Sequence, residues 1–578
     1  MDMKKRTTRR GRRSVGTLIC GEAPTERRPP IFASVLVLMF LGSSVFSSAE
    51  TSKVWKDWVS GKPVIPDYSW AGYKYGTEAI PDVTWEVFNV IDFGAVANDG
   101  KSDFDAIQKA VKAAEANGSG IVFFPKGKFL VAEKEGRKES IKIHGANIVL
   151  RGSGSGQGGS EIHQKHHYVP EDTTKKWTTP PVFSFETPGS GAYHFRLRES
   201  FVPVTTVVEA AKNGTFRIDA ANASKFKIGQ TIMLHMQNTA ANDVFLKGLK
   251  PRDIFHEIVD NGVSVAEKHT VVKIEGNTLF LEEPLHTDIN PSHGWKVYDY
   301  PTTQGWGVED IHFSGNSPTP FVHHKDYIHD SGYFAVEMIQ GKNGWIRRCR
   351  FTDLSHACYA TGCMATSFLM NTVDGHQGHG NFNTKWGYGN LIGLCQDLSD
   401  IGSFHGCGIS HEHVGGVIWR YESVGETKQT PRCGGPDFHA QFPYCSLWDS
   451  SVANLRNNGG ASFLQPNHLV DLTFWNFEQI GEKIYHDYWN MPKTAEEKKD
   501  MYFGKTKIVY PNYIGFHGVR STFNEDHLGI VESYGTPVEP ESLYEAQLTH
   551  RLGDAPSWVL EAKSEWGKVK LMHKEAGQ

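Results

Sequence analysis

Histidines concentrate in one stretch of this 578-residue chain. Between residues 350 and 440 they form three groups, and residues 379, 405–413 and 439 are separated by 26–34 positions. Imidazole takes up and releases protons near neutral pH, so such groups suit acid–base catalysis. We therefore predict that proton transfer is carried by residues of this set: His379, His411, His413 and His439, with His405 as an alternative to His411 and Lys385 as a further acid.

Cations and carboxylates lie in the same stretch. Arg420 and Arg432 could bind a substrate carboxylate through paired hydrogen bonds, and Asp374 and Asp437 are further candidate substrate-binding residues. Asp374 with Asp437 or Glu412 would alternatively be the carboxyl pair of a hydrolase.

A metal site is an open alternative. His411 and His413, if on a strand, would point to one side with the spacing of metal ligands. Turns rich in Asp and Asn could hold Ca²⁺ through hard oxygens. Neither a third ligand nor a dedicated calcium loop is identifiable, so the metal ligands stay unassigned; no cofactor is established by the sequence, and Ca²⁺ is the candidate.

Short apolar runs recur at a near-constant period through this region. They begin near residues 345, 367, 390, 416, 446 and 469, at steps of 22, 23, 26, 30 and 23 residues. That period is typical of a solenoid, in which each coil packs on the next. Stacked coils bring residues one period apart onto one flank, so His379, His405 or His411, and His439 are expected on a common, solvent-accessible surface.

The segment 88–131 indicates which solenoid this is. Residues 88–94 read as a strand, Asp103 as the N-cap of a helix over 104–116, and residues 121–124 as a second strand. This order resembles the N-terminal cap of the pectin-lyase-like superfamily. The resemblance implies an all-β fold, a right-handed single-stranded parallel β-helix with a cap helix.

The resemblance does not extend to the known catalytic patterns. Asn371-Thr-Val-Asp374 and Gly378-His379-Gly380 are similar to motifs of polygalacturonase-like hydrolases, but the chain has no Asp-Asp pair. The Asp cluster of calcium pectate lyases is not evident either. Residues 435–442 and 465–477 resemble a bacterial group of secreted β-helix proteins of little-known activity.

The rest of the chain divides by composition. Residues 50–87 read as an N-terminal arm, 88–202 as the cap and first coils, and 203–300 as an inserted β subdomain of short alternating strands. Residues 301–477 are the main coils with the active groove. Residues 478–578 are the last coils and a cap, with a helix expected near 494–500 and a short helix or strand at 542–552 over the open end.

Residues 1–49 read as a targeting segment, with basic residues before an apolar run at 31–46 and a small-residue cleavage site at 47–49. We expect a signal peptide, with an uncleaved anchor as the alternative, and hence a secreted or periplasmic protein without a membrane span after cleavage. The remaining chain has 51 Lys and Arg against 62 Asp and Glu, a net charge of −11. This balance argues against nucleic acid as a partner.

Seven cysteines remain beyond the leader, all between residues 349 and 445. An odd number cannot pair completely, and we expect mainly a ladder of buried thiols. If a disulfide forms, Cys433–Cys445 is the first pair to test.

These observations favour an exported enzyme that degrades a polysaccharide, most simply a lyase acting on a uronate-containing chain. β-Elimination needs a base, an acid and a cation that neutralises the uronate carboxylate, and His, Lys and Arg supply all three. A glycoside hydrolase on the same fold and a non-catalytic glycan-binding surface protein are the alternatives.

Overall fold

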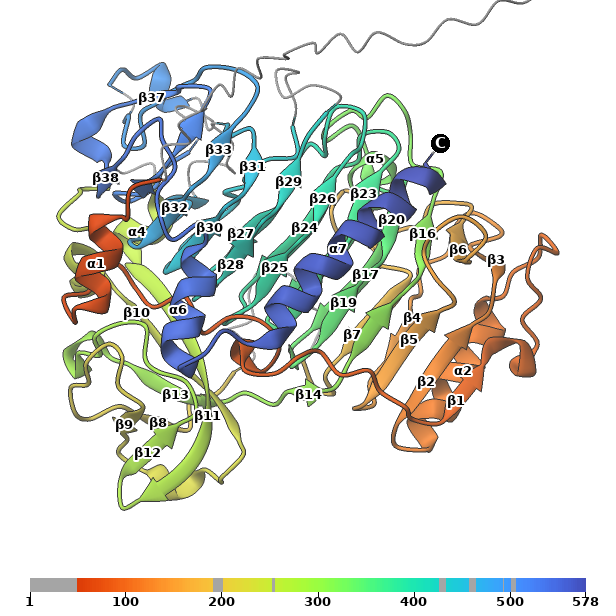
Figure 1. Ribbon diagram of the computed structural model, residues 1–578. Helices are drawn as coiled ribbons and strands as arrows, with labels where there is room; N and C mark the ends of the chain where they lie inside the picture. The colour runs from red at the N-terminus through yellow and green to blue at the C-terminus, as the bar shows by residue number, and fades with distance from the viewer. Residues whose placement is uncertain are drawn as a thin grey trace, which may run out of the picture. The chain divides into compact units, whose positions relative to one another are not determined.

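The computed structural model describes residues 49–190, 201–251, 255–425, 433–456, 464–491, 493–499 and 506–577. All but the last residue of the predicted leader lie outside these ranges. The described chain forms a right-handed parallel β-helix with an antiparallel insert and helices on its surface, which confirms the expected fold class (Figure 1).

Three parallel sheets build the β-helix; the first two extend along most of it, and the third covers its earlier coils, where each coil contributes a strand to each sheet in its best-formed part. The first sheet has twelve strands: β1 (Val87–Asn89), β2 (Gly120–Phe124), β5 (Ile148–Gly152), β15 (Gly307–Glu309), β19 (Trp345–Arg347), β22 (Ser367–Leu369), β25 (Leu391–Gly393), β28 (Val417–Trp419), β30 (Ser446–Asp449), β32 (Leu472–Trp475), β35 (Asn512–Ile514) and β38 (Val531–Glu532).

The second sheet has ten strands: β3 (Gly127–Val131), β6 (Ser160–Gln164), β16 (His312–Ser314), β20 (Arg350–Thr352), β23 (Thr372–Asp374), β26 (Gln396–Asp397), β29 (Glu422–Ser423), β31 (Val452–Ala453), β33 (Glu478–Gln479) and β36 (His517–Gly518). The third sheet has six: β4 (Ile141–Ile143), β7 (Phe183–Glu186), β17 (Phe334–Ile339), β21 (His356–Thr361), β24 (Gly380–Lys385) and β27 (Gly408–Ser410). Two short parallel pairs complete the coils, β14 (Thr303–Gln304) with β18 (Gly341–Lys342) and β34 (Tyr485–His486) with β37 (Thr522–Phe523).

The periodic apolar runs are the strands of the first sheet. Trp345 pairs with Ser367, Ser367 with Leu391, and Leu391 with Val417, so the coils stack in register. The recurrence read from the sequence is therefore the repeat of the β-helix.

Each coil has three corners, which are the segments that join its strands. The corners differ in length, and loops project from the longer ones. The first corner, between the first and second sheets, is a tight turn in which one residue adopts the left-handed conformation. This holds in seven coils, at Asp310, Arg348, Met370, Leu394, Arg420, Ser450 and Asn476, with φ between 46° and 60°. The second corner, between the second and third sheets, is longer, for example residues 398–407 between β26 and β27. The third corner leads to the next coil.

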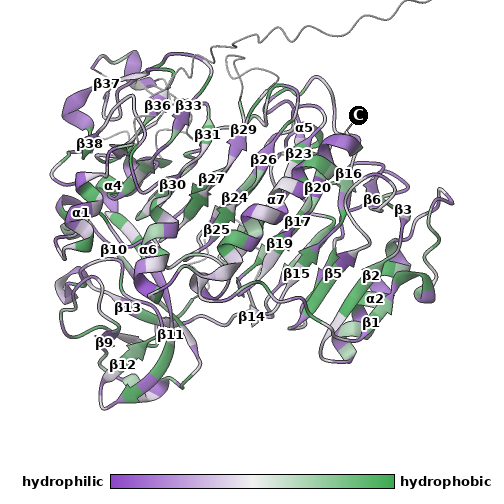
Figure 2. Cartoon of the chain, in the orientation of Figure 1, coloured by the Kyte–Doolittle hydropathy of each residue, from purple (hydrophilic) through white to green (hydrophobic). Residues whose placement is uncertain are grey.

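Like side chains stack inside the β-helix. The rings of Phe313 and Phe351 lie 5.3 Å apart and nearly parallel, and those of Phe474 and Tyr513 lie 4.9 Å apart. Inward-facing apolar residues alternate with outward-facing polar ones along many strands, which appears as mixed colouring in Figure 2.

The cysteines are free and mostly buried, as expected, but the register does not stack one on another: Cys358 pairs with Val336 and Phe382. All seven in the described chain are free, so the Cys433–Cys445 disulfide is wrong. Six are buried, and burial raises the pKa of Cys395 to about 12.

The N-terminal cap contains α2 (Phe104–Ala116), with the predicted bounds. Asp103 occupies the N-cap position, but its carboxylate does not cap the helix. It accepts hydrogen bonds from the backbone amides of Val96 and Leu130, both at 2.8 Å. Asp103 therefore ties the turn before α2 to strand β3.

The insert is a six-stranded antiparallel sheet in the order β8-β13-β10-β11-β12-β9. Its strands are β8 (Thr205–Thr206), β9 (Arg217–Asp219), β10 (Thr231–Asn238), β11 (Val263–Glu275), β12 (Thr278–Leu281) and β13 (Lys296–Asp299), and it carries α3 (Asn242–Phe245) and α4 (His256–Asp260). Buried polar contacts join it to the β-helix: Tyr444 donates to Glu267, and Lys342 lies 3.6 Å from Glu283.

The N-terminal arm, which contains one helix, and two C-terminal helices cover the first sheet. The arm, with α1 (Lys53–Val59), packs Tyr68 and Tyr75 into the same apolar cluster as Leu391 and Trp419. The expected element at 542–552 is helix α6 (Leu543–Leu552), followed by α7 (Ser557–Ala576). Both lie against the outer face of the sheet rather than over the open end, and α7 crosses several strands (Figure 1).

Residues 497–499 form a single 3₁₀ turn where a helix over 494–500 was expected. In the described part of the chain, no helix combines the length and apolar character needed to cross a bilayer.

Candidate functional site

The second corner gathers histidines from successive coils. His379 precedes β24 and His405 precedes β27, and a parallel bridge between Gly380 and His405 places these two turns side by side. Their ring centroids lie 4.9 Å apart, and those of His405 and His439 lie 4.8 Å apart. The stacking of coils thus brings together three histidines that are 26 and 34 residues apart in the sequence.

A loop from an earlier coil covers this cluster. It connects β16 to α5 (Tyr327–Ser331) and carries His323 and His324. Nε2 of His323 lies 3.3 Å from Nε2 of His405, and the His323 ring stacks on Phe404 at 4.1 Å. Phe321 stacks on His379 at 5.7 Å, so aromatic rings shield one side of the histidines.

Carboxylates orient the rings of His405 and His324 through hydrogen bonds, and the ring of His439 lies close to one of these carboxylates. His405 donates from Nδ1 to Asp437 at 3.2 Å, and Nδ1 of His439 lies 3.9 Å from the same carboxylate oxygen. Nδ1 of His324 lies 2.7 Å from the Asp330 carboxylate. His379 is held differently, because its Nδ1 donates to the backbone carbonyl of Asp330 at 2.6 Å.

Polar side chains continue from this cluster along the outer face of the third sheet. The register aligns Glu337, Tyr359, Asn383, Gly408 and Asp437 in one column. Lys385 is in the adjacent column, 3.7 Å from Glu337 and 5.1 Å above the Tyr359 ring. The outer face therefore offers an ammonium group beside the histidine–aspartate cluster.

Burial favours the neutral form of His323, His379 and His439. Burial lowers the pKa of His323 to about 3 and that of His439 to about 4, although Asp437 opposes the shift at His439. Burial also lowers the pKa of His379 well below its usual value. The pKa of Asp437 is lowered because the attraction of His405 and His439 outweighs the effect of burial. At neutral pH the cluster thus combines imidazoles able to accept a proton with an ionised carboxylate.

Five residues of the predicted site lie on or beside this surface: His379, His405, His439, Lys385 and Asp437. His379 is only 6% exposed, whereas the His439 side chain is 37% exposed. The expectation that His379 faces solvent is therefore wrong, and His439 is the more accessible base.

His411 and His413 lie at the third corner. His411 and Glu412 both adopt the left-handed conformation, with φ of 50° and 54°, so they form a turn and not a strand. The His411 ring contacts Trp386 at 4.3 Å, while His413 is 0% exposed. The expectations of an exposed His413 and of a metal pair on one strand face are both wrong.

Arg420 and Asp374 are held by other partners. Arg420 occupies the tight first corner and pairs with Glu541 and with Glu545 of α6, at 2.9 and 2.7 Å. Asp374, at the end of β23, pairs with Arg350 at 2.6 Å. The placement of these two residues with the histidines is therefore wrong. Arg432 lies outside the described residues.

This surface has further members that were not predicted as site residues from the sequence: His323, His324, Asp330, His356, Tyr359 and Glu337. The adjacent histidines 323 and 324 were a visible signal, but they lie in a long loop outside the periodic pattern. Tyr359 and Glu337 could have been found from alternation, since each lies between inward-facing neighbours on its strand.

Metal-ligating atoms converge here as well. One ring nitrogen from each of His323, His379 and His405 lies within 4.8 Å of the others, and so do ligand atoms of His405, Asp437 and His439. The set is rich in imidazole and contains few hard oxygens, so it suits a transition metal better than Ca²⁺.

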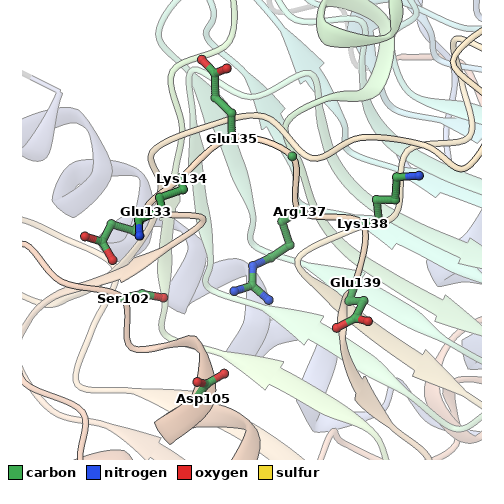
Figure 3. A pocket seen from close by; sticks show the side chains of 9 residues that line it. Ser102, Asp105, Glu133, Lys134, Glu135, Arg137, Lys138 and Glu139 are labelled. Atoms are coloured by element: carbon green, nitrogen blue, oxygen red, sulfur yellow. The ribbon is translucent and has the colours of Figure 1, made fainter.

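A large hollow lies elsewhere, beside the cap helix. It has a volume of about 550 Å³ and is lined by Ser102, Asp105 and residues 133–139 (Figure 3). Arg137 extends into it over the ring of Phe104, at 3.8 Å. Its charges are of both signs and its lining contains no histidine. We therefore place the candidate site on the histidine surface.

Comparison with known proteins supports the class that the fold defines. Residues 87–364 match the family described as rhamnogalacturonase A/epimerase, pectate lyase-like, and residues 402–562 match a domain of unknown function, DUF4955. This match covers just under half of the chain and, together with the parallel β-helix, supports a β-helix protein similar to the pectate lyase-like superfamily.

Two curated relatives from Azotobacter vinelandii match over 70 residues, 12% of this chain. Mannuronan C5-epimerase AlgE3 is 37% identical and alginate lyase 7 is 36% identical, and the matches cover 4% and 8% of those proteins. The chain thus spans a small part of their length.

The solved structures that resemble this chain do so only with low TM-scores. The tailspike protein gp49 of Pseudomonas phage LKA1 gives a TM-score of 0.35 at 11% identity, over 78% of this chain and 79% of that one. An exopolygalacturonase of Thermotoga maritima gives 0.31 at 12% identity, over 80% and 94%. At these scores the likeness adds nothing to the fold seen in the sheets.

Proposed function

We propose that this protein is an exported polysaccharide lyase that cleaves a uronate-containing chain by β-elimination. The observation that carries the proposal is the His405–Asp437–His439 cluster beside Lys385 on the outer face of the third sheet. The pectate lyase-like family supports action on a polysaccharide. The two relatives, named for an alginate lyase and a mannuronan C5-epimerase, support a uronate substrate.

His439 is the proposed base for the C5 proton. It is the most exposed of the three stacked histidines, and its lowered pKa leaves the ring neutral at physiological pH. Asp437 lies 3.9 Å from its Nδ1 and would stabilise the imidazolium that forms. The carboxylate therefore assists the step without taking the proton itself, and as the C4–O4 bond breaks the departing oxygen would take its proton from the His439 imidazolium.

Lys385 is the proposed cation for the uronate carboxylate. The register carries Lys385 over Ser410 and then toward His439, two coils further. Two strand spacings of about 4.8 Å separate the two backbones by roughly 10 Å. The side chains of Lys385 and His439 are long enough to contact one sugar residue of a bound chain and the sugar next to it. An ammonium group near the carboxylate would stabilise the charge that develops at C5.

The pair Asp437 and Glu337 does not have the spacing of a glycoside hydrolase. Asp437 and Glu337 are four strands apart in one column, which corresponds to about 19 Å at the usual spacing. A glycoside hydrolase needs its two carboxyls roughly 5–10 Å apart. Asp374, the other expected member of a pair, is bound to Arg350 at the second sheet.

The proposal is tested by incubating the protein with a panel of acidic polysaccharides that includes alginate and pectate. We expect ultraviolet absorbance from unsaturated uronate ends, and His439→Ala should lower the rate by roughly 10²–10⁴-fold. The matched control is His376→Ala, which removes a histidine from the same corner that is bonded to Asp353.

Reducing ends that form without absorbance would identify a hydrolase and overturn the proposal. Binding without cleavage would identify a non-catalytic glycan-binding protein. Export is tested separately, by N-terminal sequencing of protein recovered from the medium or periplasm, where we expect a start near Glu50.

A further inference from the structure

We propose that His323, His379 and His405 bind a divalent transition-metal ion, such as Zn²⁺, at the second corner of the β-helix. Three histidines from three separate segments direct ring nitrogens at one point, within 4.8 Å of one another. Imidazole is a preferred ligand of zinc and its neighbours, and three histidines with an open fourth position form a recurring catalytic zinc site.

The available nitrogens are set by hydrogen bonds on the other side of each ring. His379 donates from Nδ1 to the carbonyl of Asp330, and His405 donates from Nδ1 to the carboxylate of Asp437. Each ring therefore keeps its Nε2 lone pair for the interior of the cluster. A backbone carbonyl or carboxylate behind a histidine is the usual arrangement around metal sites, where it fixes the tautomer and raises ligand basicity.

The distances between nitrogens fit a coordinated ion. Nε2 of His323 lies 3.3 Å from Nε2 of His405. Two nitrogens at about 2.0–2.1 Å from one tetrahedral zinc are separated by roughly 3.3–3.4 Å. The observed separation of these two nitrogens therefore matches that of two ligands of one zinc ion.

One nitrogen remains unexplained without an ion. Nε2 of His379 is buried and has no hydrogen-bond partner among the described residues. A hydrogen bond between His323 and His405 would satisfy both of those rings, but it would leave His379 unpaired, which costs about 1–3 kcal/mol. A metal ion satisfies all three nitrogens at once.

The surroundings are those of a protected site with one open side. Phe321 and Phe404 stack on His379 and His323, and such an apolar shell limits access of water. Only the role of the ion rests on the proposed function: near Lys385 it would help to neutralise the uronate carboxylate.

The experiment uses the full-length purified chain and Zn²⁺ alone. Protein stripped with a chelator is titrated with Zn²⁺ by calorimetry, and the Co²⁺-loaded form is examined for the absorption bands of tetrahedral cobalt. We expect one ion per chain. His323→Ala and His405→Ala should weaken binding by more than about 100-fold, and Asp437→Asn by roughly 10–100-fold.

The control is His376→Ala, whose ring lies in the same corner but is bonded to Asp353 and Ser317. This variant should bind Zn²⁺ as the parent does, and circular dichroism checks that each variant is folded. His323 is in a surface loop, so its replacement is the least disruptive. Absence of stoichiometric binding, or unchanged affinity in both ligand variants, would overturn the proposal. Because no substrate is used, this result is independent of the lyase assay.

Discussion

Asp437 and Asp374 show how two aspartates near one β-helix can differ in role. Asp437 contacts His405 and lies beside His439, whereas Asp374 is bonded to Arg350 and Thr352. We expect Asp437→Asn to lower kcat/KM by roughly 10²–10⁴-fold on the confirmed substrate, because the imidazolium that forms loses its counter-charge.

The matched variant Asp374→Asn should leave kcat/KM unchanged. It should lower the free energy of unfolding by about 1–3 kcal/mol, because the buried Arg350 loses its charged partner. Kinetics and denaturant unfolding of both variants separate the two roles. A large kinetic defect in Asp374→Asn would contradict the assignment.

The histidine spacing could be read from the sequence because stacked coils convert a period into proximity. His379, His405 and His439 follow that period and do meet. His323 could not be placed, since its loop lies outside the repeat. Arg420 was misplaced because the pattern does not reveal that Glu541 and Glu545, more than 120 residues later, bind it.

At the scale of elements, one buried carboxylate anchors the C-terminal helices to the first sheet. Asp449, at the end of β30, accepts hydrogen bonds from the hydroxyl of Ser542 and from the amides of Leu543 and Tyr544, at the start of α6. Burial raises its pKa to about 6, while these donors oppose the shift.

We expect Asp449→Ala to lower the free energy of unfolding by about 1–3 kcal/mol, because buried donors at the helix N-terminus lose their acceptor. The control is Glu541→Ala, which removes a 70% exposed partner of Arg420 and should cost at most about 1 kcal/mol. Chemical denaturation measures both. Equal effects would mean that Asp449 does not anchor α6.

Helix α7 could have been found from the sequence. Its buried residues Trp558, Ala562, Trp566 and Val569 recur at intervals of three or four. Its position against the sheet could not, because that depends on outward-facing apolar residues such as Leu391 and Trp419. Local periodicity predicts an element, whereas the surface that it covers is a property of distant residues.

At the scale of the whole molecule, buried histidines couple stability to pH. Burial lowers the pKa of His356 and His573 to about 3 and that of His468 and His486 to about 4. In the unfolded chain these rings titrate near their usual value of about 6.5. Below that pH the unfolded state binds protons that the native state does not.

Stability should therefore be greatest above about pH 6.5 and should fall as the pH drops toward 4. Each such histidine contributes up to about 1.4 kcal/mol per pH unit in that window. His269 opposes the trend: burial lowers its pKa, but its hydrogen bond to Glu267 and the nearby carboxylate of Glu283 outweigh burial and raise it. With four histidines acting in one direction, the net slope should remain positive.

We expect the unfolding midpoint in denaturant to decrease steadily between pH 7.5 and pH 5, as followed by tryptophan fluorescence. The variant His573→Gln should make the free energy of unfolding less dependent on pH, by up to about 1.4 kcal/mol per pH unit, which is the contribution of one histidine. Its ring contacts only the hydroxyls of Ser155 and Thr372 among the hydrogen bonds of the described residues, and a glutamine amide can bond to hydroxyls without titrating. A midpoint that is constant over this range would show that the buried histidines are protonated in the folded protein, and that charged partners offset the cost of their burial.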